Sequence, residues 1–177
     1  LTDVTGVQTC ALPIFRASKD GDASAVRTLI AAGASANARA GKAKLTPLHV
    51  ARDAEVVKAL IAAGADVNAR SKHGWSPLHG EEPWTTGPAL KKTTELIAAG
   101  ADVNARNRDG RTPLHCATDT TVVKALITAG ADAKAIDSLG RTTLHGMRDG
   151  EAVRLLVEAG ADVRAADKSR HTPLHCV

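Results

Sequence analysis

The chain has 177 residues, of which 44% are hydrophobic, but Phe15, Trp75 and Trp84 are its only Phe, Trp or Tyr residues, so a large aromatic core is excluded. Its formal net charge of +4 is too small for a dedicated nucleic-acid binder. No apolar run reaches the roughly 18 residues that a membrane-spanning helix needs. The three cysteines are too few, and odd in number, for a disulfide framework. We therefore expect a reducing compartment, with the cytoplasm as the default location.

The first fourteen residues fit no pattern found in the rest of the chain. Residues 4–14 resemble the in-frame translation of a common sequencing-library adapter at every position. We therefore predict that residues 1–14 are a disordered assembly artefact, and we exclude them from fold reasoning like any fusion scar. A natural disordered N-terminus is the alternative, and resequencing the locus distinguishes the two.

From Phe15 onward the chain repeats itself. Residues 15–18 are the predicted end of a first helix, and residues 23–32 are a predicted second helix that ends at Gly33. Gly-Ala followed by Asp or Ser then recurs at Gly33, Gly64, Gly100, Gly130 and Gly160. The sequence Thr-Pro-Leu-His, intact or altered, ends at His49, His79, His115, His145 and His175, with steps of 30, 36, 30 and 30 residues. Two motifs with one period predict a solenoid of stacked units.

Each predicted second helix carries an apolar stripe and a start signal. Three apolar positions precede each glycine with helical i, i+3, i+4 spacing, as in Val26, Leu29 and Ile30, and Thr93 is the single polar residue in the set. An aspartate stands eleven residues before four of the glycines, where it is expected to cap the helix: Asp22, Asp53, Asp119 and Asp149. In the Thr-Pro-Leu-His motif, Pro suits the first turn of a short helix and Thr its N-cap.

Each unit therefore consists of a short helix, a turn, a longer helix and a segment of about eleven residues. In one of these segments Asp109-Gly110 is a hairpin-turn signal. With its TPLH and GADVN motifs, this unit resembles the ankyrin repeat family over residues 15–177. The resemblance implies an all-α repeat solenoid of about five helix–turn–helix units, joined by β-hairpin-like fingers and followed by a truncated first helix. It also implies a non-catalytic module that binds other proteins.

Several residues depart from the family pattern. Most units have 30 residues instead of the usual 33, whereas residues 81–88 form a long turn that contains Trp84. Gly80 and Gly146 occupy a first-helix position where a larger apolar residue would pack, so we expect those helices to be weaker. Lys44 and Arg170 replace the finger glycine found in other units. The chain ends inside a first helix, and we therefore expect it to be a fragment of a longer protein.

No residue pattern indicates catalysis, a metal site or a cofactor. The resemblance gives the five motif histidines a structural role, in which the ring nitrogens hydrogen-bond Thr and backbone groups. His115-Cys116 and His175-Cys176 resemble nucleophile pairs only in sequence, because adjacent helical residues do not face each other. The sequence contains no phosphate-binding loop or hydrolase motif. We therefore predict that the chain is not an enzyme.

The resemblance implies binding on the concave side, which the fingers and the ends of the first helices line. Of the 23 Lys and Arg residues, 13 lie in the five finger segments. The candidate partner-binding residues are Leu45, Arg52, Arg70, Lys72, Trp75, Arg106, Arg108, Arg111, Arg141, Arg148 and His171. They form a basic face that suits an acidic protein partner, with Trp75 as an aromatic anchor. Alternatively, this charge only keeps the array soluble.

Two further functions differ in class. The chain could be the regulatory or targeting part of a larger enzyme or secreted effector, which recovery of the full reading frame would test. Nucleic-acid binding is a weaker alternative, because no aromatic residues are interleaved with the basic ones.

Overall fold

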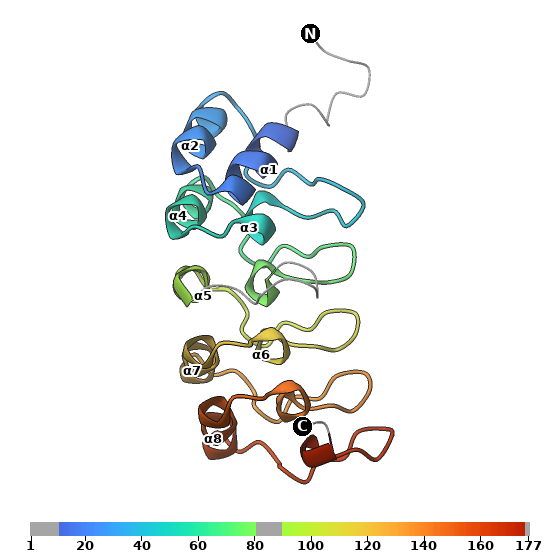
Figure 1. Cartoon of the computed structure of the whole chain (residues 1–177). Helices are drawn as coiled ribbons and strands as arrows, with labels where there is room; N and C mark the ends of the chain where they lie inside the picture. The colour runs from blue at the N-terminus through green and yellow to red at the C-terminus, as the bar shows by residue number, and fades with distance from the viewer. Residues whose placement is uncertain (1–10, 81–89, 176–177) are drawn as a thin grey trace.

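Two parallel columns of helices run along the molecule in the computed structural model, which describes residues 11–80 and 90–175 (Figure 1). The first helices are α1 (Ala11–Asp20), α3 (Pro47–Val50), η1 (Pro77–His79), α6 (Pro113–Cys116), η2 (Thr143–Gly146) and η3 (Pro173–His175). The second helices are α2 (Ala23–Ala31), α4 (Ala54–Ala62), α5 (Leu90–Ala98), α7 (Thr120–Thr128) and α8 (Gly150–Glu158). The three η elements are 3₁₀ helices. Trp84 and the long turn around it lie outside the described residues.

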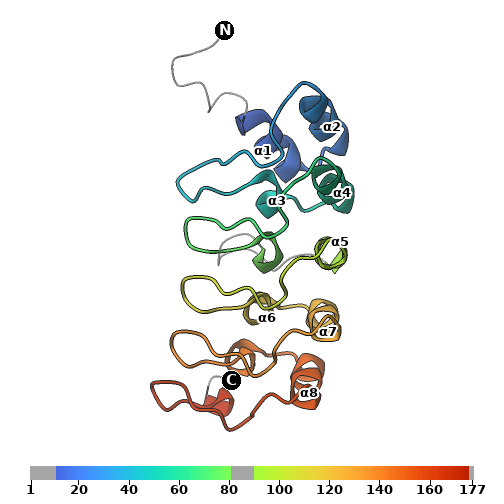
Figure 2. The same ribbon diagram turned by 180° about the vertical axis from the view of Figure 1, so that it is seen from behind.

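Long loops project from the column of first helices, on the side away from the second helices (Figure 2). We call these loops the fingers, and they comprise residues 34–45, 65–75, 101–111, 131–141 and 161–171. In the described ranges the extended pairing is limited to isolated bridges between Ala40 and Leu45 and between Ile136 and Thr142. The predicted all-α solenoid with hairpin-like fingers is therefore confirmed.

The packed chain begins earlier than the sequence suggested. Helix α1 starts at Ala11, inside the segment that was set aside, and the Ile14 side chain is fully buried. The Ser18 hydroxyl donates to the Ile14 carbonyl at 2.7 Å, one helical turn back. The fold thus includes residues before Phe15, because an apolar side chain at position 14 covers the first repeat. The adapter origin of residues 4–14 stays a prediction.

The predicted apolar stripe forms the core between neighbouring units. Leu60, Leu96, Leu126 and Leu156 of the second helices have no exposed surface. Burying one such side chain contributes roughly 1.5–3 kcal/mol. From α3 onward each first helix carries one leucine; Leu114 is fully buried, whereas Leu174, in the last described helix, is 81% exposed. Each unit is therefore stabilised by the unit that follows it.

Aspartate caps start four of the second helices, as predicted. The Asp53 carboxylate accepts hydrogen bonds from the backbone N–H groups of Glu55 and Val56 at 2.8 and 3.3 Å. Asp22, Asp119 and Asp149 accept from N–H groups in the first turns of their own helices. Because the first N–H groups of a helix have no intrahelical acceptor, each aspartate fixes the residue at which its helix begins.

Helix α5 carries two polar residues in the core. Lys92 stands where α4 has Val56; it is 3% exposed, and its ammonium donates to the His49 carbonyl at 2.8 Å. Thr93 stands where α4 has Val57; it is fully buried, and in the described part of the chain its hydroxyl has no hydrogen-bond partner. A buried hydroxyl without a partner lowers stability.

We expect Thr93→Val to raise the free energy of unfolding by about 1 kcal/mol, because it removes the unsatisfied hydroxyl and keeps the shape of the side chain. Urea unfolding followed by circular dichroism measures the change. The matched control is Val123→Thr at the same position of α7, where valine is fully buried, and it should lower stability by about 1–3 kcal/mol. A loss of stability in Thr93→Val would contradict this account.

Candidate partner-binding surface

The finger tips are joined to each other along the array by backbone hydrogen bonds. The Lys72 N–H donates to the Ala43 carbonyl at 2.7 Å, and the Arg108 N–H donates to the His73 carbonyl at 3.0 Å. The same contact joins the later fingers through the N–H groups of Ser138 and Lys168. The fingers therefore form one continuous surface instead of five independent loops.

The tips also need an unusual backbone conformation. Gly74 has φ of 79°, and a Cβ atom there would lie 3.1 Å from the Arg108 backbone nitrogen of the next finger. Lys44 and Arg170, which replace this glycine, have φ of 53° and 65°. This left-handed conformation is costly for residues with a Cβ. The first and last fingers therefore keep the same tip geometry at an energetic cost.

Asparagines connect the bases of successive fingers. The Asn37 amide donates to the Gly64 carbonyl at 2.9 Å and accepts from the Asp66 N–H at 2.7 Å. Asn68 and Asn104 make the same pair of contacts to the units that follow them. Lys134 occupies the corresponding position in the next unit, so this connection is not made between the last two fingers.

Histidines connect the first helices to the following finger. The His49 Nδ1 lies 2.8 Å from the Thr46 hydroxyl, and its Nε2 lies 3.0 Å from the Trp75 carbonyl. His79, His115 and His145 make equivalent contacts, with Nε2 to carbonyl distances of 3.0–3.1 Å. Both ring nitrogens are therefore occupied, and the predicted structural role of these histidines is confirmed.

Arginines make a third connection, one that sequence analysis did not identify. The Arg39 guanidinium donates to the Arg70 carbonyl at 2.8 Å, the Arg70 guanidinium to the Arg106 carbonyl, and the Arg106 guanidinium to the Ile136 carbonyl. Arg70 and Arg106 were expected to bind a partner. The structure shows that each also binds the next finger, and both residues remain exposed.

Trp75 is placed differently from the other candidates. It is only 4% exposed, and its ring packs edge-on against His79 with centroids 5.5 Å apart. An aromatic anchor must offer its ring to a partner, so this burial removes Trp75 from the accessible surface. Leu45 is half-buried in the first finger, where its backbone pairs with Ala40.

Five other candidates are exposed, but they do not all lie together. Lys72 and Arg108 lie at neighbouring finger tips. Arg52 and Arg148 lie in turns between a first and a second helix. His171, in the last finger, has its Nδ1 3.8 Å from an Asp167 carboxylate oxygen. The structure thus brings the tip residues into one surface and leaves the turn residues apart from them.

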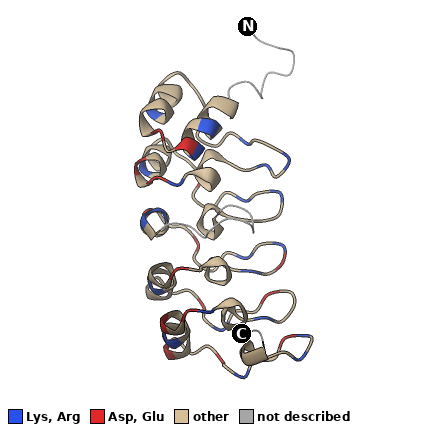
Figure 3. Ribbon diagram, viewed as in Figure 1, with Lys and Arg blue, Asp and Glu red and all other residues tan. Residues whose placement is uncertain are grey.

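Charged residues lie both on the second helices and on the fingers (Figure 3), but they differ in their ion pairs. On the second helices, cations pair with acids within and across units: Lys58 contacts Glu55 at 3.1 Å and Glu95 at 3.6 Å, and Arg27 contacts Glu55 at 3.6 Å. In the described chain, no ion pair involves the exposed cations Lys42, Lys44, Lys72, Arg108, Lys168 and Arg170. The finger tips therefore present cations that form no ion pair within the described chain.

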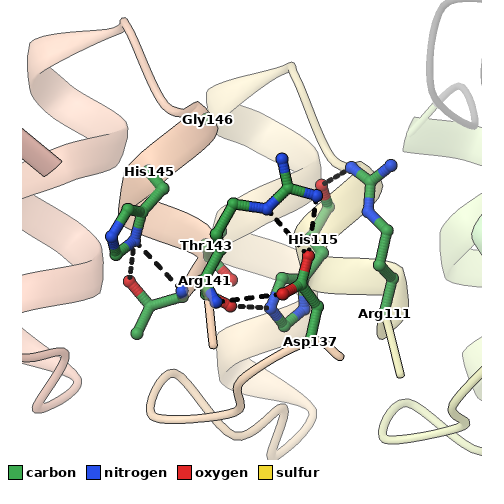
Figure 4. Close-up of a pocket in the computed structure, with 8 residues that line it drawn as sticks. Arg111, His115, Asp137, Arg141, Thr143, His145 and Gly146 are labelled. Atoms are coloured by element: carbon green, nitrogen blue, oxygen red, sulfur yellow. Dashed lines mark hydrogen bonds and ion pairs between the residues drawn. The ribbon is translucent and has the colours of Figure 1, made fainter. Parts of the chain in front are cut away.

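Two candidates meet in a hollow between α6 and η2 (Figure 4). The hollow has a volume of about 70 Å³, is open to solvent and is lined by Arg111, Arg141 and Asp137, among others. The Arg141 guanidinium donates twice to one Asp137 oxygen, at 2.9 and 3.0 Å. Burial alone would raise the pKa of Asp137, but hydrogen bonds from the Arg141 backbone and guanidinium hold it below its ordinary value.

Comparison with known proteins is consistent with this geometry. Residues 14–80 match a family model of three ankyrin repeats. Residues 90–119 match a model of many ankyrin repeats, and residues 109–138 match a model of one ankyrin repeat. The chain belongs to the ankyrin repeat family. A search of curated proteins found no match to this ankyrin array. Ankyrin repeats are in general protein–protein interaction modules and are typically non-catalytic.

The Cys116 thiol is buried, and the neighbouring His115 is engaged in hydrogen bonds. Burial raises the pKa of the Cys116 thiol to about 11, and both ring nitrogens of the adjacent His115 are held elsewhere. Within residues 11–80 and 90–175, no group of three His, Cys, Asp or Glu side chains is placed to hold a metal ion. Across the same ranges, no helix has the length and apolar character to cross a bilayer.

Proposed function

We propose that this ankyrin array binds an acidic segment of a partner protein along its finger tips and the adjacent first helices. The proposal is supported mainly by the unpaired cations at the finger tips, whereas several cations of the second helices, such as Lys58 and Arg154, are paired with acids. A surface of one sign attracts a partner of the opposite sign and orients it during encounter. The backbone, asparagine and arginine contacts between fingers favour binding as well, because a preorganised surface loses little conformational entropy on binding.

A display library of unstructured peptides, selected against the whole chain, tests the proposal. The selected peptides should be enriched in Asp and Glu, and their affinity should fall as salt concentration rises. Peptides without acidic enrichment would contradict an acidic partner.

Charge reversal locates the surface. The double variant Lys72→Glu and Arg108→Glu changes two neighbouring finger tips and should weaken the selected peptides by at least about tenfold, since like charges now oppose each other. The matched control, Lys91→Glu with Lys124→Glu, makes the same change in net charge at exposed positions of α5 and α7. It should change affinity by less than about twofold, because screening weakens charges at that distance. Equal losses in both double variants would show that net charge, not the finger face, determines binding.

A further inference from the structure

The hollow between α6 and η2 has a combination of residues that the described chain does not repeat at other interfaces. Arginine precedes the Thr-Pro-Leu-His position in two successive units only here, as Arg111 and Arg141. Gly146 follows the histidine and contributes no side chain, whereas Cys116 holds that position one unit earlier. At the preceding interface, Trp75 stands at the position that Arg111 has here. The absence of large side chains leaves space that both guanidinium groups line.

The hollow carries one net positive charge. Arg141 is neutralised by Asp137, whose side chain is 2% exposed and also accepts the N–H groups of Leu139 and Arg141. Arg111 donates one N–H to the His115 carbonyl at 3.0 Å, and within the described chain it contacts no acid. A carbonyl is neutral, so this contact positions the Arg111 guanidinium without cancelling its charge (Figure 4).

A buried hydroxyl lines the same hollow. Thr143 stands where the other units have proline, and it therefore adds a side-chain hydroxyl and a backbone N–H that proline lacks. It is 4% exposed and lines the hollow, and its buried hydroxyl has no hydrogen-bond partner among the residues that the structure describes. Because this oxygen is closed to solvent, Thr143 shapes the wall of the hollow without presenting its hydroxyl to a ligand.

We infer that this hollow binds the carboxylate of a Glu or Asp side chain of the partner segment, with the Arg111 guanidinium as its donor. The inference rests on the proposed function and specifies one subsite of it. A carboxylate fits better than a phosphate, because the single net charge of the wall matches one negative charge and the Asp137 carboxylate disfavours two. Charge-assisted hydrogen bonds from a guanidinium are among the stronger polar contacts in proteins.

Amide chemical shifts of the whole chain test the site directly. The probe is acetyl-Gly-Gly-Glu-Gly-Gly-amide, with the Gln peptide as its isosteric control. The Glu peptide should shift the amide signals of Arg141, Thr143 and Gly146 in a saturable way, and the Gln peptide should not. Equal shifts with both peptides, or stronger shifts with inorganic phosphate, would overturn the inference, as would no shift up to the solubility limit.

Two variants of different kinds connect the hollow to the partner. Arg111→Gln removes the charge and should weaken the selected acidic peptides by at least about tenfold, in keeping with the loss of a charged hydrogen bond. Gly146→Leu leaves every charge in place and fills the hollow; a Cβ at this position meets no atom within 4 Å, so the fold should persist. It should cause a similar loss, and circular dichroism checks that each variant is folded.

The outcomes separate this inference from the proposed function. The selected peptides could bind both hollow variants as tightly as the unmodified chain but lose affinity for the finger-tip double variant. This result would overturn the carboxylate subsite and leave the proposed surface intact. If the selection returns no acidic peptides while the Glu probe still shifts Thr143 and Gly146, the proposed function fails and the subsite stands.

Discussion

Acidification from pH 7 to about pH 4 should remove on the order of 6 kcal/mol from the free energy of unfolding, through two buried histidines. His49 and His79 are 0% and 1% exposed. Burial lowers the pKa of each ring from 6.5 to about 4, although hydrogen bonds to the Trp75 and Arg111 carbonyls oppose the change. Each folded ring therefore stays neutral over a pH range in which the unfolded chain binds a proton.

The sign of the effect follows from this difference in proton uptake. Between pH 6.5 and about pH 4 the unfolded state binds more protons than the folded state, so stability falls as the pH falls. Each pKa unit corresponds to about 1.4 kcal/mol, which gives about 3 kcal/mol for each histidine. The stabilisation is complete above pH 6.5 and is lost once the pH is below the folded pKa.

Urea unfolding at a series of pH values measures this loss. The slope of stability against pH should be about 2.7 kcal/mol per pH unit, or about 1.4 for each ring. The variant His79→Gln should reduce that slope by about 1.4 kcal/mol per pH unit, whatever its stability at neutral pH, since it removes one of the two most strongly shifted rings. A free energy of unfolding that is equal at pH 7 and pH 5 would contradict the burial of neutral rings.

Alanine at two equivalent glycines should change stability in opposite directions. Gly80→Ala should lower the free energy of unfolding by about 1–3 kcal/mol, because Gly80 has φ of 91° and ψ of −169°, a region that residues with a Cβ rarely adopt. Gly146→Ala should raise it by about 0.5–1 kcal/mol. Gly146 is the last residue of η2, is not among the glycines with positive φ, and has open space at its Cβ position.

Urea unfolding of the two variants beside the unmodified chain provides the test, and each variant serves as the control for the other. Both substitutions add the same methyl group at the same position of the repeat, so unfolded-state effects are nearly equal. A change in the same direction for both would show that backbone conformation does not distinguish these sites. The expectation that both first helices are weakened is consistent with η1 and η2 being 3₁₀ helices, whereas α3 and α6, with Val50 and Cys116 at this position, are α-helical.

Much of the fold could be predicted because its determinants are local. The second helices follow from the spacing of apolar residues such as Val57 and Leu60, and their starts follow from aspartates two or three residues before the N–H groups that they accept. The structural role of the histidines followed from the family resemblance. One of the two contacts of each ring is local, since His49 caps a helix that begins after Thr46. Period and pattern within one unit were sufficient for these conclusions.

The candidate surface depended on contacts between units. Arg70 and Trp75 were indistinguishable from free binding residues in the sequence, yet Arg70 holds a carbonyl 36 residues away and Trp75 is buried. Arg141 and Thr143 were not seen as neighbours of one hollow with Arg111. Within the described chain, the departures from the repeat at Thr143 and Gly146 were the only sequence signals that could have located it.

The sequence by itself therefore determined the repeat, the helices, their caps and the family, since these depend on residues a few positions apart. The tertiary structure decided which basic side chains are available to a partner, which hold neighbouring fingers, and where two arginines and an unsatisfied hydroxyl come together. The physical reason is that a side chain in a stacked array meets residues about 30 positions away, and the pattern within one unit does not specify those contacts.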